Sequence, residues 1–285
     1  TEAKPVATRP QSDLPWSGAA LGSADLSLIT AFGRPRIIGL VGLENAGKTT
    51  TLATLYLLLS RGYELEDRVF AGSVTLQGWE ALASTMRLPP SGSGVGFPDH
   101  TTSTDRQPGL LHLAFRRPNG ARDDVLFADA PGESFREWAD QADSKTASGA
   151  RWLARHADAL AVLNDSEALA GPDRGTYRSQ QSRLIGRMGD VADERPIVVV
   201  WAKSDVEVAP GLRNQLARQA SRFLPNSTTF DVTARPEKWD EASVRSFLKL
   251  FETLLDAPLT KPAPLHIPSL HPADPLLSFR GHAHS

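Results

Sequence analysis

The feature that most constrains the fold is the segment GLENAGKT at residues 42–49, which follows a short apolar run and precedes a helical pattern. Its glycines let the backbone curl until successive N–H groups point inward, and the helix that begins near Lys48 directs its positive dipole end to the same place. Such a turn requires a buried strand before it and a helix after it. The segment therefore predicts an α/β fold with a phosphate-binding loop.

This loop matches the pattern G-x-x-x-x-G-K-[ST] at every fixed position. We expect the Lys48 ammonium to reach the β- and γ-phosphates of a nucleotide and the Thr49 hydroxyl to complete the ligand shell of Mg²⁺. The motif alone does not identify the base. The residues expected to surround the phosphates are Glu44, Asn45, Ala46, Gly47, Lys48, Thr49 and Thr50.

Apolar runs of strand length alternate with helical patterns along the middle of the chain. The expected strands are residues 36–41, 110–116, 125–128, 159–164, 197–201 and 228–232, and the expected helices are residues 48–59, 145–156, 174–188, 210–223 and 240–255. The sequence Pro118-Asn119-Gly120 is a hairpin signal. The pattern therefore predicts a P-loop NTPase domain with a mostly parallel six-stranded sheet, one antiparallel edge strand and helices on both faces.

Weakly periodic, proline-containing sequence at both ends delimits one domain. We expect an N-terminal arm at residues 1–33, the domain at residues 34–257 and a Pro/His-rich tail at residues 258–285. The irregular spacing of the tail histidines favours a solvated segment over a metal site. Insertions at about residues 61–109 and 132–158 exceed ordinary connections, and we expect them to be mobile loops that a ligand orders.

Composition argues against several classes of partner. A net charge of -2 and a pI near 6.4 provide no basic field for nucleic acid. No apolar stretch approaches the roughly 20 residues of a membrane span. The absence of cysteine excludes disulfides and thiolate metal sites and fits a reducing compartment. We therefore expect a cytoplasmic protein that does not bind nucleic acid and does not span a membrane.

A carboxylate and a glycine follow the third expected strand, in the sequence VLFADAPGE. Asp129 lies where a strand-end carboxylate can hold Mg²⁺ directly or through water, and the Gly132 amide can approach a γ-phosphate. Alone, D-x-x-G is a common pattern. Downstream of a phosphate loop it indicates that Lys48 and Gly132 act on the same phosphate group, with Thr49 and Asp129 as metal ligands.

The sequence IVVVWAKSD repeats this arrangement, with a lysine and an aspartate at the end of a buried strand. Ligands of α/β sheets bind at that edge. The Asp205 carboxylate can accept both N1–H and N2–H₂ of guanine, and adenine offers no such pair of donors. The Lys203 stem can lie along the base, and the Ala234 N–H can contact guanine O6. We therefore expect GTP and GDP as ligands.

These motifs, in this order on successive strands, resemble those of the small GTPases of the translation-factor-related class, over roughly residues 34–257. The loop GLENAGKTT is especially similar to that of ADP-ribosylation-factor-like and signal-recognition-receptor β-like GTPases, which also carry an acidic residue where Ras has glycine. The stretch FAGSVTLQGWEAL resembles bacterial double-GTPase families, whose genes occur in pairs. The resemblance implies a G domain that converts GTP to GDP and phosphate, with a second GTPase as one candidate partner.

Two positions depart from the family pattern. Ala202 replaces the Asn of the N-K-x-D motif, which binds guanine N7 and connects the base loop to the phosphate loop; its loss should cost about 1–3 kcal/mol of affinity. Glu133 replaces a Gln that orients the attacking water. A carboxylate can accept from that water but cannot donate to the γ-phosphoryl oxygens, so we assign Glu133 a catalytic position and expect slow hydrolysis.

The family's threonine ligand of Mg²⁺ and γ-phosphate has three candidates here, Thr101, Thr102 and Thr104, upstream of the strand at residues 110–116. We assign Thr102 as metal ligand and catalytic residue, with solvated loop hydroxyls as the alternative. Arg106 and Arg136 are candidates for an internal arginine finger, although a surface role is the simpler interpretation.

The sequence thus predicts a GTP-binding molecular switch with slow Mg²⁺-dependent hydrolysis, whose nucleotide-ordered loops control a protein effector or regulator. The alternative is a non-hydrolysing scaffold that binds guanine nucleotides, which Ala202 and Glu133 favour. An ATP-dependent kinase or motor is disfavoured, because it would leave the pair Lys203 and Asp205 unexplained and no lid arginine cluster is recognisable.

Overall fold

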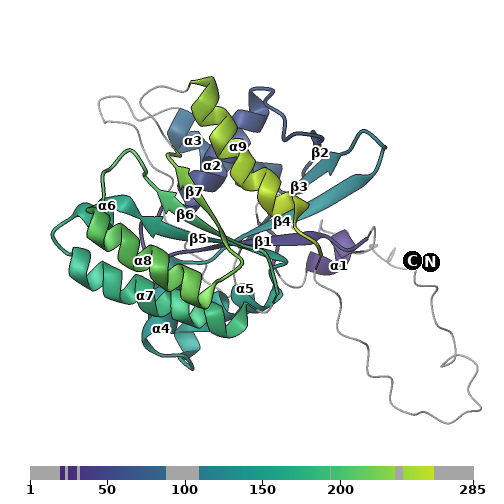
Figure 1. The fold of residues 1–285 in the computed structure, drawn as a ribbon. Coiled ribbons are helices and arrows are strands. Elements are labelled where there is room, and N and C mark those ends of the chain that lie inside the picture. Colours follow the sequence, from purple (N-terminus) through teal and green to yellow (C-terminus); the bar gives the residue numbers. More distant parts are fainter. Residues whose placement is uncertain are drawn as a thin grey trace, which may run out of the picture.

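The computed structural model describes residues 20–22, 25–30, 33–87, 109–192, 194–234 and 240–259, and these form one sheet covered by helices (Figure 1). Seven strands pair in the order β2-β3-β4-β1-β5-β6-β7. β3 is antiparallel to both of its neighbours, and the other pairs are parallel. The predicted fold class is confirmed. The strands are β1 Arg36–Val41, β2 Val69–Gly72, β3 Gly109–Arg116, β4 Arg122–Asp129, β5 Ala159–Asp165, β6 Ile197–Ala202 and β7 Thr228–Val232.

Strand β2 is the difference from the six strands predicted. It has four residues, the side chains of Val69 and Phe70 are 51% and 43% exposed, and its pairing with β3 is irregular between Phe70 and Gly72. Such a short, exposed strand needs neither an apolar run nor strict alternation, so the sequence gives little signal for it. Because β2 takes the edge of the sheet, the antiparallel strand β3 lies one place in from that edge.

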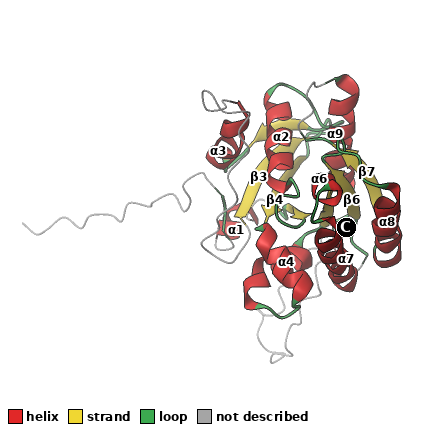
Figure 2. Cartoon of the chain, turned by 90° about the vertical axis from the view of Figure 1, so that its left-hand side faces the viewer, coloured by secondary structure: helices red, strands yellow, loops and turns green. Residues whose placement is uncertain are grey.

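Helices cover both faces of the sheet, and neighbouring residues of β4 show how each face is filled. Leu126 belongs to the apolar cluster with α4, α5, α7 and α8, whereas the Phe127 ring contacts Trp79 of α3 and Phe251 of α9, with centroids 5.8 and 6.0 Å apart. Figure 2 shows α4 and α7 on one side and α2 and α9 on the other. Strands buried on both faces explain the continuous apolar runs of the sequence. The helices described are α1 Leu26–Thr30, α2 Lys48–Ser60, α3 Leu76–Arg87, α4 Gly132–Asp140, α5 Ser148–His156, α6 Ser166–Ala170, α7 Arg174–Val191, α8 Pro210–Phe223 and α9 Glu241–Asp256, with a 3-10 turn at Lys145–Ala147.

Residues 132–158, which we expected to be a mobile insertion apart from the helix at residues 145–156, are mostly helical, as α4, the 3-10 turn and α5. Phe135 and Trp138 of α4 and Leu153 of α5 are buried in the apolar cluster on one face of the sheet. This packing attaches the segment to the sheet. None of the helices in the part of the chain that the structure describes is long and apolar enough to cross a membrane.

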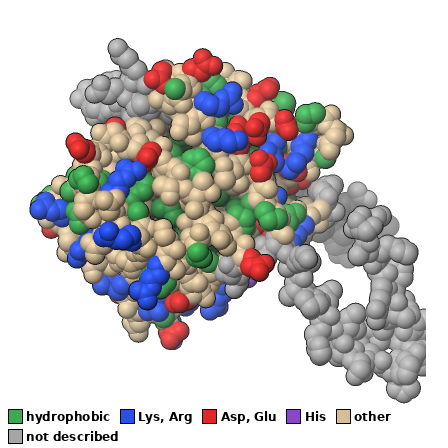
Figure 3. All heavy atoms as spheres, viewed as in Figure 1, with side chains coloured by type: hydrophobic (Ala, Val, Ile, Leu, Met, Phe, Trp, Pro, Cys, Tyr) green, Lys and Arg blue, Asp and Glu red, His purple; other side chains and the backbone are tan. Residues whose placement is uncertain are grey.

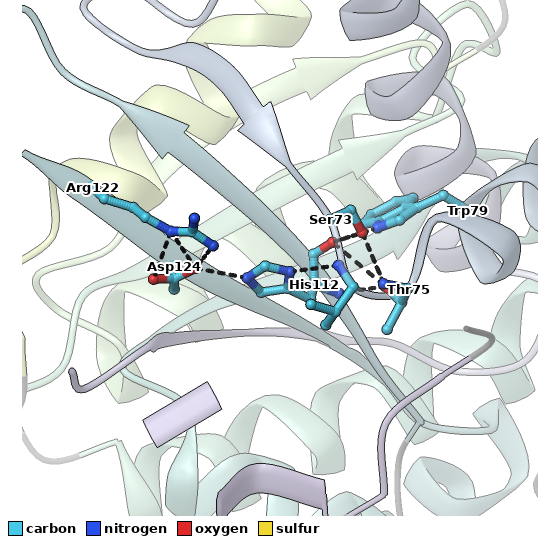
Figure 4. A network of polar contacts seen from close by, with 7 residues as sticks. Ser73, Thr75, Trp79, His112, Arg122 and Asp124 are labelled. Carbon is cyan, nitrogen blue, oxygen red and sulfur yellow. Dashed lines mark hydrogen bonds and ion pairs between the residues drawn. The ribbon is translucent and has the colours of Figure 1, made fainter. Parts of the chain in front are cut away.

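The outer edge of β3 is completed by strand β2, by side chains and by part of the expected N-terminal arm. The backbones of Leu21 and Leu110 exchange hydrogen bonds of 2.8 and 3.1 Å, and the Leu21 side chain is buried. At His112, the Thr75 hydroxyl accepts from the backbone N–H (2.8 Å) and the Trp79 indole donates to the carbonyl (2.9 Å; Figure 4). The backbone polar groups of β3 are thus satisfied where β2 does not reach.

The imidazole of His112 is fully buried and bonded through both ring nitrogens (Figure 4). The Val74 N–H donates to Nδ1 at 3.1 Å, which requires the ring proton to be on Nε2, and Nε2 lies 2.9 Å from Asp124 Oδ1. Burial lowers the pKa of His112, although the hydrogen bond to Asp124 opposes this shift. His112 is therefore a neutral residue that connects the segment between β2 and α3 to the sheet.

Candidate nucleotide-binding site

Four loops meet at one edge of the sheet, because parallel strands present their carboxyl ends on the same side. The phosphate loop, residues 42–49, follows β1, and the segment from Ala130 follows β4, which ends at Asp129. The base loop, residues 202–205, follows β6, and Thr233 and Ala234 follow β7. The topology thus brings together the stretches of sequence in which we predicted site residues.

The phosphate loop curls around its own lysine. Asn45 (φ 60°) and Gly47 (φ 86°) adopt left-handed backbone conformations, which these two residue types tolerate better than others. Lys48 is only 6% exposed, and its Nζ donates to the carbonyls of Gly42 (3.0 Å) and Leu43 (3.2 Å). Thr50 lies in the first turn of α2. The ammonium is therefore held inside the loop.

The electrostatics of this loop suit an anion. Burial lowers the pKa of Lys48, and the carboxylates of Asp129, Glu133 and Glu44 oppose that shift. A buried ammonium is costly unless an anionic partner compensates for the lost hydration. A phosphate group bound in the loop would supply that partner.

Thr49 and Asp129 lie side by side next to Lys48. The Thr49 hydroxyl donates to Asp129 Oδ2 at 2.8 Å, and the Asp129 carboxylate is buried at the end of β4. A hydroxyl and a carboxylate beside a phosphate loop are the hard oxygen ligands that Mg²⁺ prefers, with phosphate oxygens completing its shell. No group of three or more His, Cys, Asp or Glu side chains suited to a metal occurs among the described residues.

Four of the predicted loop residues fall outside the described part of the chain. These are Thr101, Thr102, Thr104 and Arg106. The assignment of Thr102 as metal ligand and catalytic residue therefore stays a prediction.

Helix α4 begins directly against the phosphate loop. A Cβ atom built on Gly132 would lie 2.5 Å from the Glu44 Cα, closer than real Cβ contacts, so only glycine fits there. Further along the helix, Arg136 forms a 2.7 Å ion pair with Glu44. Glu133, in the first turn of α4, is exposed. The first turns of α4 thus flank the loop, and Arg136, for which we favoured a surface role, contacts it.

The base loop is held by hydrogen bonds to the loop after β7. The Ser204 N–H donates to the Val232 carbonyl (3.3 Å), and the Ser204 hydroxyl lies 2.9 Å from Thr233 Oγ1. The Thr233 hydroxyl donates to Asp205 Oδ1 at 3.1 Å. Asp205 is exposed, and this bond to one of its carboxylate oxygens orients the side chain.

Lys203 and Ala202 connect the base loop to two different neighbours. Lys203 adopts a left-handed conformation (φ 54°), and its ammonium donates to Asp165 Oδ2 (2.9 Å) and Glu167 Oε2 (2.8 Å). Ala202 is buried, and a Cβ built on Gly47 would lie 4.0 Å from the Ala202 Cβ. Ala202 therefore meets the phosphate loop through a methyl group alone.

Our sequence reasoning missed three residues of this site. Thr233 holds Asp205, and its position directly before the predicted Ala234 was an available signal. The Thr54 hydroxyl of α2 donates to the Ala234 carbonyl at 2.8 Å. Asp165 is 38 residues from Lys203, and the only signal for it is an acidic residue at the end of a buried strand.

A model of the family described as Double-GTPase 2 matches residues 36–252. One similar solved structure is a Plasmodium falciparum protein described as nucleolar GTP-binding protein 1, with 12% identity, 78% of this chain and 87% of that chain covered, and a TM-score of 0.44. Another is Era in complex with MgGDPNP and nucleotides 1506–1542 of 16S ribosomal RNA, with 16% identity, coverage of 81% and 60%, and a TM-score of 0.38. No curated protein matches the chain.

Proposed function

Because the chain belongs to the Double-GTPase 2 family, we propose that it is a GTP-binding switch that hydrolyses GTP slowly and controls a protein partner. The observation that carries the guanine assignment is the placement of Asp205. Its carboxylate is held by Thr233 at the sheet edge that also bears the phosphate loop. A carboxylate there can accept both donors of the guanine edge, and adenine would leave it unpaired.

The chain's own groups support phosphoryl transfer to water. Lys48 and the loop amides, including that of Gly132, would stabilise negative charge on the transferred phosphoryl group, and Glu133 would accept a hydrogen bond from the attacking water. Bound Mg²⁺, held by Thr49, Asp129 and Thr102, would neutralise charge on the phosphate oxygens. Glu133 cannot donate to the phosphoryl oxygens, so we expect slow turnover.

Switching would act through α4. Its first residue touches the Glu44 backbone and its Arg136 pairs with the Glu44 side chain, so a γ-phosphate at the loop would change the environment of both contacts. A segment that responds to the γ-phosphate presents different surfaces in the GTP and GDP states, and a partner can distinguish them.

Single-turnover release of phosphate from protein loaded with GTP and Mg²⁺ tests the enzymatic part. We expect slow but measurable release that a candidate partner accelerates. Absence of release with and without the partner would instead support the alternative, a guanine-nucleotide-bound scaffold that does not hydrolyse GTP. The exposed carboxylate of Glu133 and the methyl group of Ala202 are the observations that favour this alternative.

The partner is proposed to be a protein, with a second GTPase as one candidate. On the face seen in Figure 3, Lys and Arg side chains are scattered among Asp and Glu side chains. Together with the net charge of -2, this mixture of charges favours a protein partner over nucleic acid. We propose that both proteins are cytoplasmic.

A further inference from the structure

The base loop needs a fixed position, because Asp205 discriminates between bases only if its carboxylate stays in the plane of the purine. Hydrogen bonds from Ser204 and Thr233 hold the loop on the side of β7. On the side of the phosphate loop, Ala202 offers a methyl group and no hydrogen bond from its side chain. A second set of contacts is therefore required to hold the other side of the loop.

Asp165, at the end of β5, supplies those contacts. In the parallel register of β5 and β6 it lies opposite Ala202, so it adjoins the start of the base loop. Its carboxylate is 2% exposed; Oδ2 accepts from Lys203 Nζ at 2.9 Å, and Oδ1 accepts from the N–H groups of Glu167 (2.9 Å) and Ala168 (3.3 Å). The carboxylate thus caps α6 with one oxygen and binds the lysine with the other.

The position of Asp165 is itself fixed from α7. The Asp165 N–H donates to the Tyr177 hydroxyl at 2.9 Å. The side-chain amide of Gln181 donates to the Leu163 carbonyl (3.1 Å) and to the Asn164 side chain (2.9 Å), and all three residues are buried. The end of β5 therefore has little freedom to move.

Of the two carboxylates on Lys203, Asp165 contributes more to its position. Glu167 is 70% exposed, so water screens its ion pair, whereas Asp165 is buried and its charge is compensated by Lys203 and two backbone donors. Burial disfavours the Lys203 ammonium, but the bonds to Glu167 and Asp165 outweigh this and hold the pKa of Lys203 above its usual value. The lysine is therefore charged at neutral pH.

We propose that Asp165 is a positioning residue for guanine recognition: by binding the Lys203 ammonium it holds the base loop where an amide at position 202 would otherwise hold it. This inference rests on the proposed function, since it assumes that the base loop binds guanine. Asp165 does not touch the base, and acts through Lys203.

The test is the variant Asp165→Asn, which keeps an oxygen for the cap of α6 and removes the negative charge that pairs with the Lys203 ammonium. We expect the affinity for GDP with Mg²⁺ to fall about tenfold while the affinity for ADP stays unchanged, because the phosphate loop is untouched. The same substitution at Asp173, an exposed residue whose side chain does not cap α7, is the matched control and should leave both affinities unchanged.

A second variant, Ala202→Asn, tests whether an amide at position 202 can replace the ion pair between Asp165 and Lys203. In the Asp165→Asn background, the amide should recover most of the lost GDP affinity. In the parent protein, the same substitution should raise the GDP affinity less. This difference appears as a coupling energy in a double-mutant cycle. Equal losses for GDP and ADP, an unchanged GDP affinity, or additive effects of the two substitutions would overturn the inference. A parent protein that does not prefer GDP to ADP would overturn the proposed function itself, which distinguishes the two failures.

Discussion

Asp205 and Thr233 carry the base specificity of the proposed site at the scale of single residues. The Thr233 hydroxyl holds one oxygen of the carboxylate at 3.1 Å, so the side chain is oriented before a nucleotide arrives. Orientation in advance reduces the entropy that binding must remove. The contribution of each group can be measured separately by removing the charge or the hydroxyl alone.

We expect Asp205→Asn to weaken GDP binding about 100-fold, because an amide presents a donor to one of the two guanine donors. Thr233→Val keeps the shape of the side chain and removes the hydroxyl, and should weaken GDP binding less, about three- to tenfold. Equilibrium titration with GDP measures both. An unchanged affinity for GDP in Asp205→Asn would contradict the assignment of Asp205 to the guanine edge.

Gly132 illustrates a second requirement at this scale, the space between α4 and the phosphate loop. Gly132→Ala would place a Cβ 2.5 Å from the Glu44 backbone, and we expect it to lower the free energy of unfolding by about 1–3 kcal/mol. Gly186→Ala is the matched control, because nothing lies within 4 Å of a Cβ added there, in the middle of α7; it should stabilise by about 0.5–1 kcal/mol. Denaturant unfolding compares the two, and equal effects would mean that α4 does not press on the loop.

At the scale of elements, the edge of the sheet depends on His112. Its neutral ring accepts from Val74 and faces Asp124, and protonation of Nδ1 would remove the first of these bonds. Because burial lowers the pKa of His112 in the folded state, the unfolded chain takes up the proton at higher pH than the folded chain does. The stability that this gives is fully present above about pH 6.5 and is lost as the pH falls toward the folded pKa.

His112→Gln should therefore be less stable than the parent at neutral pH, and the difference should shrink as the pH falls from about 7.5 to about 5. Thermal or denaturant unfolding across that range measures the difference in stability. Carboxylates that titrate equally in both proteins do not contribute to this difference. Parallel stability curves would show that His112 does not contribute to the pH dependence.

Elements with long apolar runs could be predicted from the sequence, and those fixed by distant contacts could not. The elements β1, β7 and α8 have the expected bounds. An apolar run indicates each of the two strands in the sequence, and a helical period of apolar residues indicates α8. β2 was not predicted, because it is an edge strand with exposed side chains. α4 was not predicted, because it follows a motif that we interpreted as a loop. In the site, local motifs indicated Lys48 and Asp205, whereas the partnership of Lys203 with Asp165 depends on two strands coming together.

At the scale of the whole molecule, two apolar layers cover the faces of the sheet, and the proposed nucleotide site lies at its carboxyl edge. Helix α4 joins both regions: Phe135 is buried in one layer, and its ring lies 5.6 Å from Lys48 Nζ in the phosphate loop. Helix α9 packs on the opposite face, in the other apolar layer. A nucleotide-dependent change should therefore affect α4 and leave α9 unaffected.

Amide hydrogen exchange tests this expectation in the full chain. We expect slower exchange in α4 with a non-hydrolysable GTP analogue than with GDP, and equal exchange in α9, which serves as the internal control. Identical exchange of α4 in the two states would contradict the switch and favour the scaffold.

The most direct test of the central claim is the affinity of the full chain for GDP and for ADP, measured side by side with Mg²⁺. We predict a micromolar or tighter dissociation constant for GDP and binding of ADP that is at least about 100-fold weaker, because Asp205 pairs with the guanine edge alone. Equal affinities for the two nucleotides would contradict it.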